Sequence, residues 1–502
     1  MVEFNGSSVK QNGNDVLKKL EWDQTRGVSN YFEIVDVVHD SIGIFHPIEK
    51  IINTPEFQRL RNIKQMGIAY LVYPSAEHSR FTHSLGVYHL ARSHINALSE
   101  RQPNLGITST DKLCVCIAGL LHDLGHGPYS HMFEVFLHKA NPSHSWRHEE
   151  GSKLIFKRML DQNHEVKEAL DRYLSEEDYL FIEELIDPPK SFIDNHGNWK
   201  LKGRPISKSF IYDIVSNKHD CLDVDKFDYL MRDSKLSKIT IPFGKVTLGR
   251  IQNNMEARKF EDVGYSRIVY GRKVRSDVYT VMYSREDLHS RLYQHKTSVA
   301  IETMVVDALV KAAPYLEYKG DDGRYYDLYH AFENISAYLQ LNDYVTEKIL
   351  ESNDPRLAEA KSILDQINRR ELLRCVGTTF FTTIPYVRKS VEQIKEDILK
   401  FDDTIDPNMV IVAVRQIHRG FTEVDPITKT LYFNQNDPSD NVLERPSDQW
   451  IRSNTSEAGR TNVYVYVPFG TSMDDYNKVF HAFEKTAKSY NCESPAKRQR
   501  RS

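Results

Sequence analysis

Cysteine is scarce in this chain, and long apolar segments are missing. The five cysteines in 502 residues are too few and too odd in number for a disulfide framework, so we expect a reducing compartment. No apolar run approaches the ~20 residues that span a bilayer. The N-terminal residues have no basic segment followed by an apolar one, which predicts no signal peptide. A disulfide-rich secreted scaffold and a membrane protein are therefore not expected.

Neither sign of charge dominates. The 66 Lys and Arg residues against 70 Asp and Glu residues give a net charge of -4. No overall attraction to nucleic acid or to an anionic membrane is expected, so any phosphate binding must come from local clusters. One such cluster is the basic tail Lys497-Arg498-Gln499-Arg500-Arg501. It is either a nuclear-import signal or a solvated end, so the nucleus is the predicted location and the cytoplasm the alternative.

Apolar periodicity divides the chain into four parts. Residues 1–30 are polar and predicted to be disordered, and residues 31–376 are predicted to form a helical domain that starts with a hairpin between Tyr31 and Phe45. Residues 377–490 are predicted to form a smaller α+β lobe with an exposed loop over 437–460, and 491–502 form the tail. The predicted fold is thus mainly α, a helical bundle with a short N-terminal β-hairpin and an α+β C-terminal lobe.

Three helices are predicted near the start of the helical domain. Thr54 is a good N-cap and Pro55 suits the first helical position, so a helix is expected from there to Gly67. Two further helices are predicted over 82–101 and 111–125, and helical character is expected to persist to about residue 373. Alternating apolar residues over 409–414, 430–433 and 462–467 predict strands in the C-terminal lobe.

The most informative segment is the run His122-Asp123-Leu124-Gly125-His126-Gly127. Adjacent imidazole and carboxylate groups suit borderline divalent ions such as Fe, Mn, Zn or Ni. His83 and Asp225 are a third and a fourth candidate ligand. They lie far from the pair in sequence, so the ligands must come from different helices packed side by side. Four ligands leave coordination positions open for water and a phosphate oxygen, as a catalytic site requires.

These ligands indicate a metal-dependent phosphohydrolase, because a bound metal can lower the pKa of its water from about 15.7 to about 7. The catalytic candidates that could donate protons or bind phosphate are His126, His131 and His148. Glu134 follows His131 by three residues and Glu149 follows His148 directly. Such a carboxylate, Glu149 in the case of His148, can keep an imidazole in one tautomer and charged. Each of these histidines could instead have a structural role.

Two predicted helix faces carry groups that could hold a nucleotide. One combines Arg285, His289, Tyr293 and Lys296, and the other combines Asp225, Tyr229 and Asp233, with Lys226 beside the metal ligand. An amphipathic surface helix could produce either pattern. A tyrosine within a polar stripe is less expected there, and it indicates stacking on a sugar or a base.

Five segments resemble the HD-domain phosphohydrolases, and most closely the deoxynucleoside triphosphate triphosphohydrolases that combine a sterile alpha motif (SAM) with an HD domain. They are FQRLRNIKQMG (57–67), HSRFTHSLGV (78–87), IAGLLHDLGHGPYSHMF (117–133), DVDKFDYLMRD (223–233) and LYQHK (292–296). The resemblance covers roughly residues 33–376 well and the C-terminal lobe more loosely. It implies hydrolysis of dNTPs to deoxynucleoside and inorganic triphosphate by attack of water on the α-phosphorus, which would lower dNTP pools.

The resemblance also implies individual roles. His83, His122, Asp123 and Asp225 would bind Zn, Fe or Mn, and Mg would accompany the triphosphate. The phosphates would be held or protonated by Arg80, His126, His131, Lys226, Tyr229 and Arg285, with His148 near the leaving group. The sugar and base would be bordered by Gln65, Met66, Asp233, His289, Tyr293 and Gln294. Tight packing at Gln65 and Met66 would reject a 2′-hydroxyl, and Asp233 would hold the 3′-hydroxyl.

Members of this family are joined into active tetramers by activating nucleotides, so GTP or dNTP activators and a homo-oligomer, from dimer to tetramer, are expected. The first activator site would use Asn53, Gln58 and Arg61, and the second would use Lys273, His295, Lys296, Arg370 and Arg374. Asn53 replaces an acidic residue of the family. An amide offers guanine one acceptor and one donor, so GTP should bind less well. The basic start of the family's hairpin is replaced by Glu33 and Val38-His39-Asp40, and no SAM domain is expected before residue 31.

Two alternatives stay open. The first is another HD-type nucleotide phosphohydrolase, a monophosphatase or a cyclic nucleotide phosphodiesterase, which would not release triphosphate. The second is a protein that binds nucleotides or single-stranded nucleic acid through the same cations. The net charge of -4 predicts that such strand binding would be weak, and it should decrease steeply as salt rises.

Overall fold

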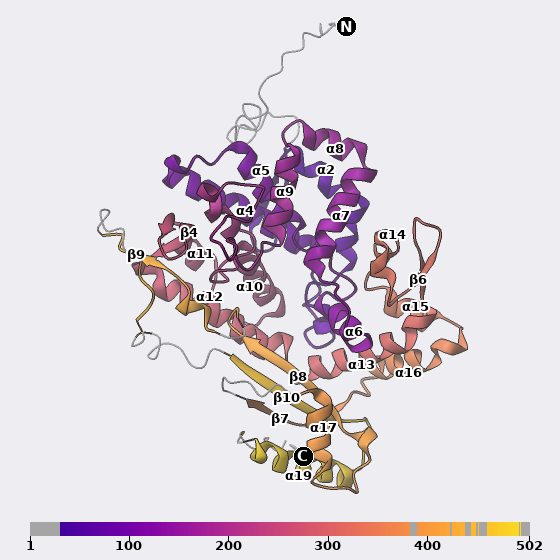
Figure 1. The fold of residues 1–502 in the computed structure, drawn as a ribbon. Helices are drawn as coiled ribbons and strands as arrows, with labels where there is room; N and C mark the ends of the chain where they lie inside the picture. Colours follow the sequence, from indigo (N-terminus) through magenta and orange to yellow (C-terminus); the bar gives the residue numbers. More distant parts are fainter. Residues whose placement is uncertain are drawn as a thin grey trace.

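Helices dominate the structure, a computed structural model that describes residues 31–381, 389–421, 424–436, 443–447, 450, 459–490 and 492. Figure 1 shows a large helical part with a small sheet and two helices at its foot. The mainly α prediction with a C-terminal α+β lobe is therefore confirmed. The predictions for residues 1–30, for the basic tail and for most of the loop over 437–460 lie outside the described residues.

The predicted N-terminal hairpin is present. Strands β1 (Phe32–Asp36) and β2 (Asp40–Ile44) pair antiparallel. Ile42 and Ile44 are fully buried, so the inner face of the hairpin joins the main core. The Asp36 carboxylate closes the turn by accepting hydrogen bonds from the backbone N–H groups of Val38 and His39, each at 2.8 Å.

Three helices surround the segment that contains His122 and Asp123. Helix α4 (Arg80–Arg101) packs against both α5 (Ser109–Leu121) and α10 (Val224–Ser237). A capping box between Thr108 and Asp111 starts α5, two residues before the predicted start. The helix predicted from Thr54 is shorter than expected. Thr54 does cap α3 (Pro55–Gln58), but a 3₁₀ turn (Arg59–Asn62) follows.

The early end of that helix has a structural cause. Ile63 is extended, and its carbonyl accepts a hydrogen bond from the Arg80 N–H at 2.9 Å, while the Gln65 N–H donates to the His78 carbonyl at 2.9 Å. The segment thus pairs with the chain that enters α4. A continued helix would have consumed these backbone groups within itself.

The rest of the helical part alternates helices with short hairpins. Its helices are α2 (Ile48–Ile52), α6 (His131–Ala140), α7 (His148–Gln162), α8 (His164–Asp171), α9 (Glu176–Ile186), α11 (Lys245–Gln252), α12 (Arg275–Leu288), α13 (Lys296–Ala312), α14 (Ile335–Tyr338), α15 (Val345–Glu351) and α16 (Ala358–Asn368). Its strands are β3 (Met255–Phe260), β4 (Tyr265–Gly271), β5 (Glu317–Lys319) and β6 (Tyr325–Asp327). Helical character persists to about residue 373 as predicted, but two hairpins that were not predicted, β3–β4 and β5–β6, lie among the helices.

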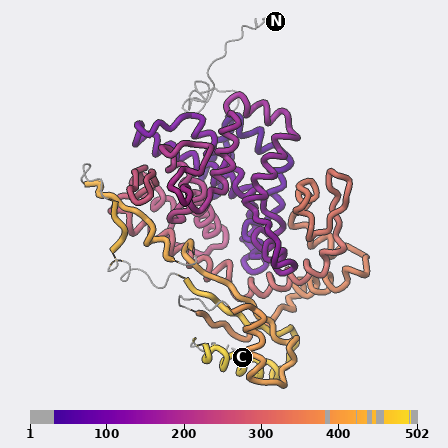
Figure 2. The backbone as a smooth tube through the Cα atoms, viewed as in Figure 1, coloured from indigo at the N-terminus to yellow at the C-terminus, as the bar shows by residue number. Residues whose placement is uncertain are grey.

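The C-terminal lobe is built on one antiparallel sheet. Its strands β7 (Arg374–Phe381), β10 (Gly459–Val467) and β8 (Ile411–His418) lie in that order, and its helices are α17 (Val391–Leu399) and α19 (Met473–Ser489). One face of the sheet packs on the two helices, and the other meets α13 through Val299 and Ala300. Figure 2 shows how the orange and yellow C-terminal segment underlies the helical part.

Two details of the predicted lobe differ from expectation. Strand β9 (Tyr432–Phe433) forms where a strand was predicted, but it pairs in parallel with β4 of the helical part. The predicted boundary after residue 376 falls inside β7, and the four-part division stays a prediction. Among the described residues, no helix combines the length and the apolar character needed to cross a membrane.

The buried side chain of Arg59 connects the loop that follows α5 to a distant part of the chain. Arg59 donates from Nε to the Leu341 carbonyl at 2.8 Å and from Nη2 to the His126 carbonyl at 2.8 Å. A third donor atom, Nη1, lies 3.5 Å from the Leu124 carbonyl. One side chain therefore fixes the turn that follows His122 and Asp123.

Substitution of Arg59 should lower the free energy of unfolding by more than substitution of an exposed arginine does. Arg59→Met keeps an unbranched apolar stem but leaves buried carbonyls without donors, so the free energy of unfolding should fall by about 2–4 kcal/mol. Thermal and urea unfolding measure this change. Arg324→Met at an exposed position is the matched control and should stay within about 0.5 kcal/mol of the parent. Equal midpoints for the two variants would contradict the role given to Arg59.

Candidate metal centre and substrate cavity

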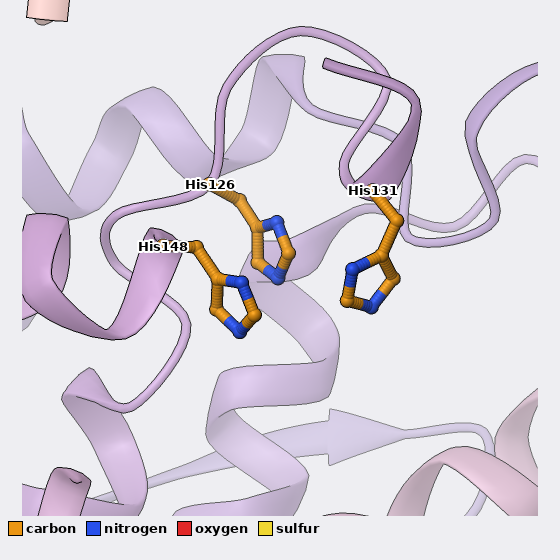
Figure 3. A group of neighbouring side chains, drawn as sticks. All are labelled: His126, His131 and His148. Atoms are coloured by element: carbon orange, nitrogen blue, oxygen red, sulfur yellow. The ribbon is translucent and has the colours of Figure 1, made fainter. Parts of the chain in front are cut away.

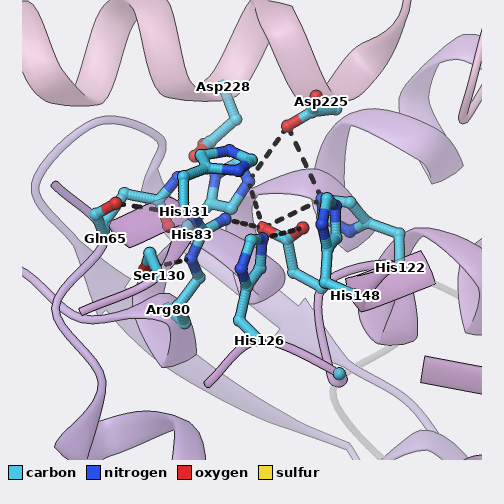
Figure 4. A network of polar contacts seen from close by, with 12 residues as sticks. Gln65, Arg80, His83, His122, His126, Ser130, His131, His148, Asp225 and Asp228 are labelled. Carbon is cyan, nitrogen blue, oxygen red and sulfur yellow. Dashed lines mark hydrogen bonds and ion pairs between the residues drawn. The ribbon is translucent and has the colours of Figure 1, made fainter. Parts of the chain in front are cut away.

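The four predicted metal ligands lie together where three elements meet. His83 is in the first turn of α4, His122 and Asp123 follow the last residue of α5, and Asp225 is in the first turn of α10. His83 Nε2 is 3.3 Å from Asp123 Oδ2 and 3.1 Å from Asp225 Oδ1. His122 Nε2 is 3.3 Å and 3.5 Å from the same two oxygens. Figure 4 shows the dashed lines that join Asp225 to the His83 and His122 rings.

The donor atoms fit a shared cation. His122 Nδ1 bonds to the Gly119 carbonyl at 2.9 Å, which requires its proton on Nδ1 and leaves a lone pair on Nε2. Nε2 is buried and has no hydrogen-bond partner among the described residues, although two carboxylate oxygens approach it. Burial favours the neutral ring, yet Asp123 and Asp225 raise the pKa of His122 to about 9. The site therefore attracts positive charge, and a divalent ion satisfies imidazole and carboxylate ligands together.

A second carboxylate orients His83. Asp228 Oδ2 accepts from His83 Nδ1 at 2.8 Å, so His83 Nε2 presents its lone pair to the centre. Arg232 donates to both oxygens of Asp228, at 2.8 and 2.9 Å, and all three residues are buried. Asp228 is a residue of this site that was not predicted from the sequence. Its only signal was a carboxylate three residues after Asp225, on the same helix.

A glycine allows α4 and α10 to come this close. A Cβ atom on Gly86 would lie 1.9 Å from Asp228 Oδ1 and 2.5 Å from Arg232 Nη2. Gly86 is three residues after His83 and therefore on the same side of α4. Any larger residue at position 86 must displace the carboxylate that holds the ligand His83.

A cavity of about 450 Å³ opens above the centre. Its lining includes Asp123, Asp225, His148 and eleven of the twelve residues predicted to bind substrate, namely Gln65, Met66, Arg80, His131, Lys226, Tyr229, Asp233, Arg285, His289, Tyr293 and Gln294. The twelfth, His126, is buried beneath the lining, with its Nε2 3.3 Å from Asp123 Oδ1. The structure thus gathers residues from distant segments around one space.

Four Lys or Arg side chains line the described cavity, and each is anchored by the protein; one of them, Arg415, pairs with Glu302 at 3.1 Å. Arg80 forms an ion pair with Asp123 and donates from Nε to Ser130 Oγ at 2.8 Å. Burial favours the protonated acid, but Arg80 and then His122 hold the pKa of Asp123 well below its usual range. Lys226 contacts Asp223 Oδ2 at 2.9 Å, and Arg285 donates to the His418 carbonyl.

Three histidines form a cluster beside the metal centre (Figure 3). The rings of His126 and His148 stack with centroids 3.9 Å apart and an interplanar angle of 14°, and His131 packs edge-on against both. Lone pairs of stacked rings run parallel and do not converge. Although ring nitrogens of all three lie within 4.8 Å of one another, this geometry suits proton transfer or phosphate binding better than a second metal ion.

Glu134 sets the charge of this cluster. Its Oε1 accepts from His148 Nδ1 at 2.8 Å and from the His148 backbone N–H at 3.0 Å, and its Oε2 is 3.6 Å from His131 Nδ1. Burial disfavours the charged ring, but the bond to Glu134 leaves the pKa of His148 above its usual value. Burial, then Arg80 and His148, place the pKa of His126 well below its usual value. The partner expected for His148, Glu149, lies 3.7 Å from Nδ1, too far for a hydrogen bond.

The opposite end of the cavity carries polar groups. Asp233 accepts from Tyr293 Oη at 2.6 Å and pairs with His78 Nε2 at 2.6 Å. Gln294 donates to the Gln416 carbonyl of β8 at 2.6 Å, while its Oε1 is buried and unpartnered among the described residues. The C-terminal lobe therefore contributes to this wall of the cavity.

The predicted helix face around Arg285 needs one correction. Helix α12 ends at Leu288 and continues as a π-helical turn (His289–Tyr293), and α13 starts at Lys296. Arg285, His289 and Tyr293 line the cavity as expected, but Lys296 is absent from the described lining. The break in helical phase separates Lys296 from the other three. The face formed by Asp225, Tyr229 and Asp233 is continuous along α10 and lines the cavity.

The residues expected at activator sites lie elsewhere. Asn53 caps the end of α2, Gln58 Oε1 accepts from Arg61 Nε at 2.7 Å, and the Arg61 guanidinium covers the Phe81 ring at 3.6 Å. The second group is spread over several elements and comprises Lys273 in a 3₁₀ turn, His295 and Lys296 at the start of α13, Arg370 bonded to the Leu71 carbonyl, and Arg374 at the start of β7. None of the eight belongs to the described lining of the cavity.

The chain is similar to known proteins that carry an HD domain. The family model of the HD domain matches residues 80–208, which contain three of the four ligand candidates. The chain is 38% identical over 460 residues to the human deoxynucleoside triphosphate triphosphohydrolase SAMHD1 and 39% identical over 420 residues to its zebrafish (Danio rerio) counterpart. These alignments cover 86% and 80% of this chain, and 71% and 66% of the relatives. A homologue of the same protein in Dictyostelium discoideum is 32% identical over 98% of this chain and 87% of its own length.

Gly86→Ala should weaken metal binding while leaving the fold in place. The added methyl group would displace Asp228 and tilt His83, and loss of such an orienting carboxylate typically costs 10–100-fold in metal affinity. Competition with a chelating indicator measures the affinity. Gly249→Ala in α11 is the control, since a Cβ there meets open space, and this variant should bind metal like the parent. Unchanged affinity in a folded Gly86→Ala variant would contradict the close-approach argument.

Proposed function

This chain belongs to the family of deoxynucleoside triphosphate triphosphohydrolases with an HD domain, and we propose that it hydrolyses dNTPs to deoxynucleoside and inorganic triphosphate in the cavity described above. The observation that carries the proposal is the convergence of His83, His122, Asp123 and Asp225 at the floor of a cavity with several cations. The chain spans about two thirds to nine tenths of the relatives compared with it.

The residues around the cavity divide the chemical tasks. A divalent ion on the four ligands would supply Lewis-acid polarisation of a phosphoryl oxygen and of water. Arg80, Lys226 and Arg285 neutralise the triphosphate. Water forms a bond to the α-phosphorus and releases a proton to solvent, while the bond from phosphorus to the 5′-oxygen breaks. His148 donates a proton to that leaving oxygen and is then reprotonated from solvent. Glu134 keeps His148 protonated for this step.

The polar end of the cavity selects the sugar. Gln65 and Met66 border the 2′ position, where close packing leaves no room for a hydroxyl. Asp233, held by Tyr293, accepts from the 3′-hydroxyl. A site that hydrogen-bonds a substrate hydroxyl discriminates strongly against analogues that lack it, because its buried polar groups would be left unpaired. Tyr293 and Gln294 contact the sugar and base, and few groups read the base, which supports a broad dNTP range.

We also propose which metal ions, activating nucleotides and cellular location belong to this activity. Mixed imidazole and carboxylate ligands support Zn, Fe or Mn at the centre, with Mg on the triphosphate. GTP or dNTP activators would join subunits into a dimer or tetramer, with weaker GTP binding because Asn53 lacks a carboxylate. The basic tail supports nuclear import, and the local cations support weak single-strand binding.

Product analysis tests the reaction. Each dNTP should yield deoxynucleoside and triphosphate, whereas NTPs should yield little. Asp225→Ala should reduce the rate at least about 100-fold without unfolding the protein, because it removes a metal ligand. The matched control is Asp262→Ala on the surface, which should retain activity. Release of orthophosphate would favour the alternative HD hydrolases. Normal hydrolysis by Asp225→Ala would refute the metal assignment. Repeating the assay with GTP tests the activator proposal.

The pH profile tests the roles of His148 and Glu134. Activity should fall on the alkaline side as His148 loses its proton. The bond to Glu134 raises the pKa of His148, so Glu134→Gln should move this alkaline limb to lower pH and reduce the rate at neutral pH by about 10-fold or more. Glu149→Gln removes a more distant carboxylate and should move the limb less. Superimposable alkaline limbs for the parent and Glu134→Gln would exclude His148 as the acid oriented by Glu134.

A further inference from the structure

We propose that His39, in the turn of the N-terminal hairpin, is a positioning residue for the metal ligand His83 and acts through Asp228. The inference rests on the proposed function, since it concerns the metal centre of that site. The hairpin is distant in sequence from the candidate metal ligands and lies outside the described cavity lining. The proposal gives it a share in metal binding.

A short chain of hydrogen bonds carries the proposal. His39 Nε2 lies 2.6 Å from Asp228 Oδ1, and the other oxygen of the same carboxylate accepts from His83 Nδ1 at 2.8 Å. The side chains of all three residues are at most 3% exposed. His83 Nε2 then faces Asp123 and Asp225. One carboxylate therefore separates the hairpin turn from a metal ligand.

Arg232 makes this connection rigid. It donates to both oxygens of Asp228, at 2.8 and 2.9 Å, and to both oxygens of Asp36, at 2.8 and 3.2 Å. Each oxygen of Asp228 thus receives one bond from Arg232 and one from a histidine. A carboxylate with its acceptor sites filled in this way has one favoured orientation. Loss of the His39 bond leaves Oδ1 held only by Arg232, which can then rotate with Asp228.

The turn itself is built to aim His39 inward. Asp36 accepts from the His39 N–H at 2.8 Å, and Asp40, the next residue, has a φ of 65°, which reverses the chain. The His39 ring packs against the His89 ring with centroids 4.8 Å apart. Yet Val35 on the outer side of the hairpin is 90% exposed. The hairpin therefore faces solvent on one side and is hydrogen-bonded on the other to Asp228, the carboxylate that orients His83.

A purely structural role for His39 makes a different prediction. If His39 only stabilised the hairpin, its loss would lower the unfolding temperature and leave metal affinity unchanged in the folded protein. If it positions His83, metal affinity and the ligand field at the metal must change while the protein stays folded. Metal binding separates the two roles without reference to activity.

The experiment uses two substitutions at position 39 and one control. His39→Phe keeps a ring against His89 but removes the donor, and His39→Gln restores an N–H donor. Lys245→Met removes the ion pair between Lys245 and Asp40, an exposed hairpin contact that does not touch Asp228. Each full-length variant is stripped of metal and titrated with Zn²⁺ against a chelating indicator. The visible spectrum of the Co²⁺-loaded protein reports ligand geometry, and calorimetry confirms folding.

We expect His39→Phe to bind Zn²⁺ about 10-fold more weakly, with an altered Co²⁺ spectrum, because mutation of outer-shell partners costs 10–100-fold. His39→Gln should recover most of the affinity, and Lys245→Met should match the parent. Parent-like affinity and spectrum in a folded His39→Phe variant would overturn the inference and leave the proposed function intact. Equal losses in His39→Phe and Lys245→Met would also overturn it, as a general loosening of the hairpin. A parent protein without Asp225-dependent Zn²⁺ binding would refute the proposed function itself.

Discussion

Two carboxylates, Asp123 and Asp225, approach the same two imidazoles at the buried floor of the cavity. Like charges brought together away from water repel each other strongly unless positive charge lies between or beside them. Arg80 supplies part of that charge through its ion pair with Asp123. A divalent ion would supply the rest, and His122 Nε2, which has no hydrogen-bond partner in the part of the chain that the structure describes, lies beside both carboxylates. The packing of α4, α5 and α10 is arranged around this electrostatic requirement.

Oriented side chains extend from this centre in two directions. Behind His83, Asp228 and Arg232 connect the metal ligand to the N-terminal hairpin, and the absence of a side chain on Gly86 gives them room. In front of it, cations together with His131 and His148 line the cavity, and His126 stacks on His148 beneath the lining. The anionic floor suits a divalent metal, and the cationic walls suit phosphate. This opposition of charge within one cavity is what triphosphate hydrolysis requires.

Local physical rules predicted elements where the chain determines its own conformation. The hairpin near Asp40, the Thr54 cap and helices α4 and α5 follow from turn, capping and periodicity signals. The rules failed where a distant partner decided the outcome. The helix after Thr54 ends early because Ile63 pairs with the chain entering α4, and β4 is a strand within a helical domain, with β9 as a partner from the distant C-terminal segment.

Residue type and spacing by themselves predicted the candidate ligand set, because an adjacent histidine and aspartate with two further ligand candidates has few structural uses. They also determined the continuous polar face of α10, since a single helix fixes its own phase. Only the tertiary structure decided which carboxylate serves which histidine. Glu134, in α6, forms a hydrogen bond with His148 at the start of α7, whereas the adjacent Glu149 lies too far from the ring. Asp228 orients His83 from another helix. Whether a hydrogen bond forms depends on differences of a few tenths of an ångström in the distance between separate elements, and no order of residues along one chain specifies those distances.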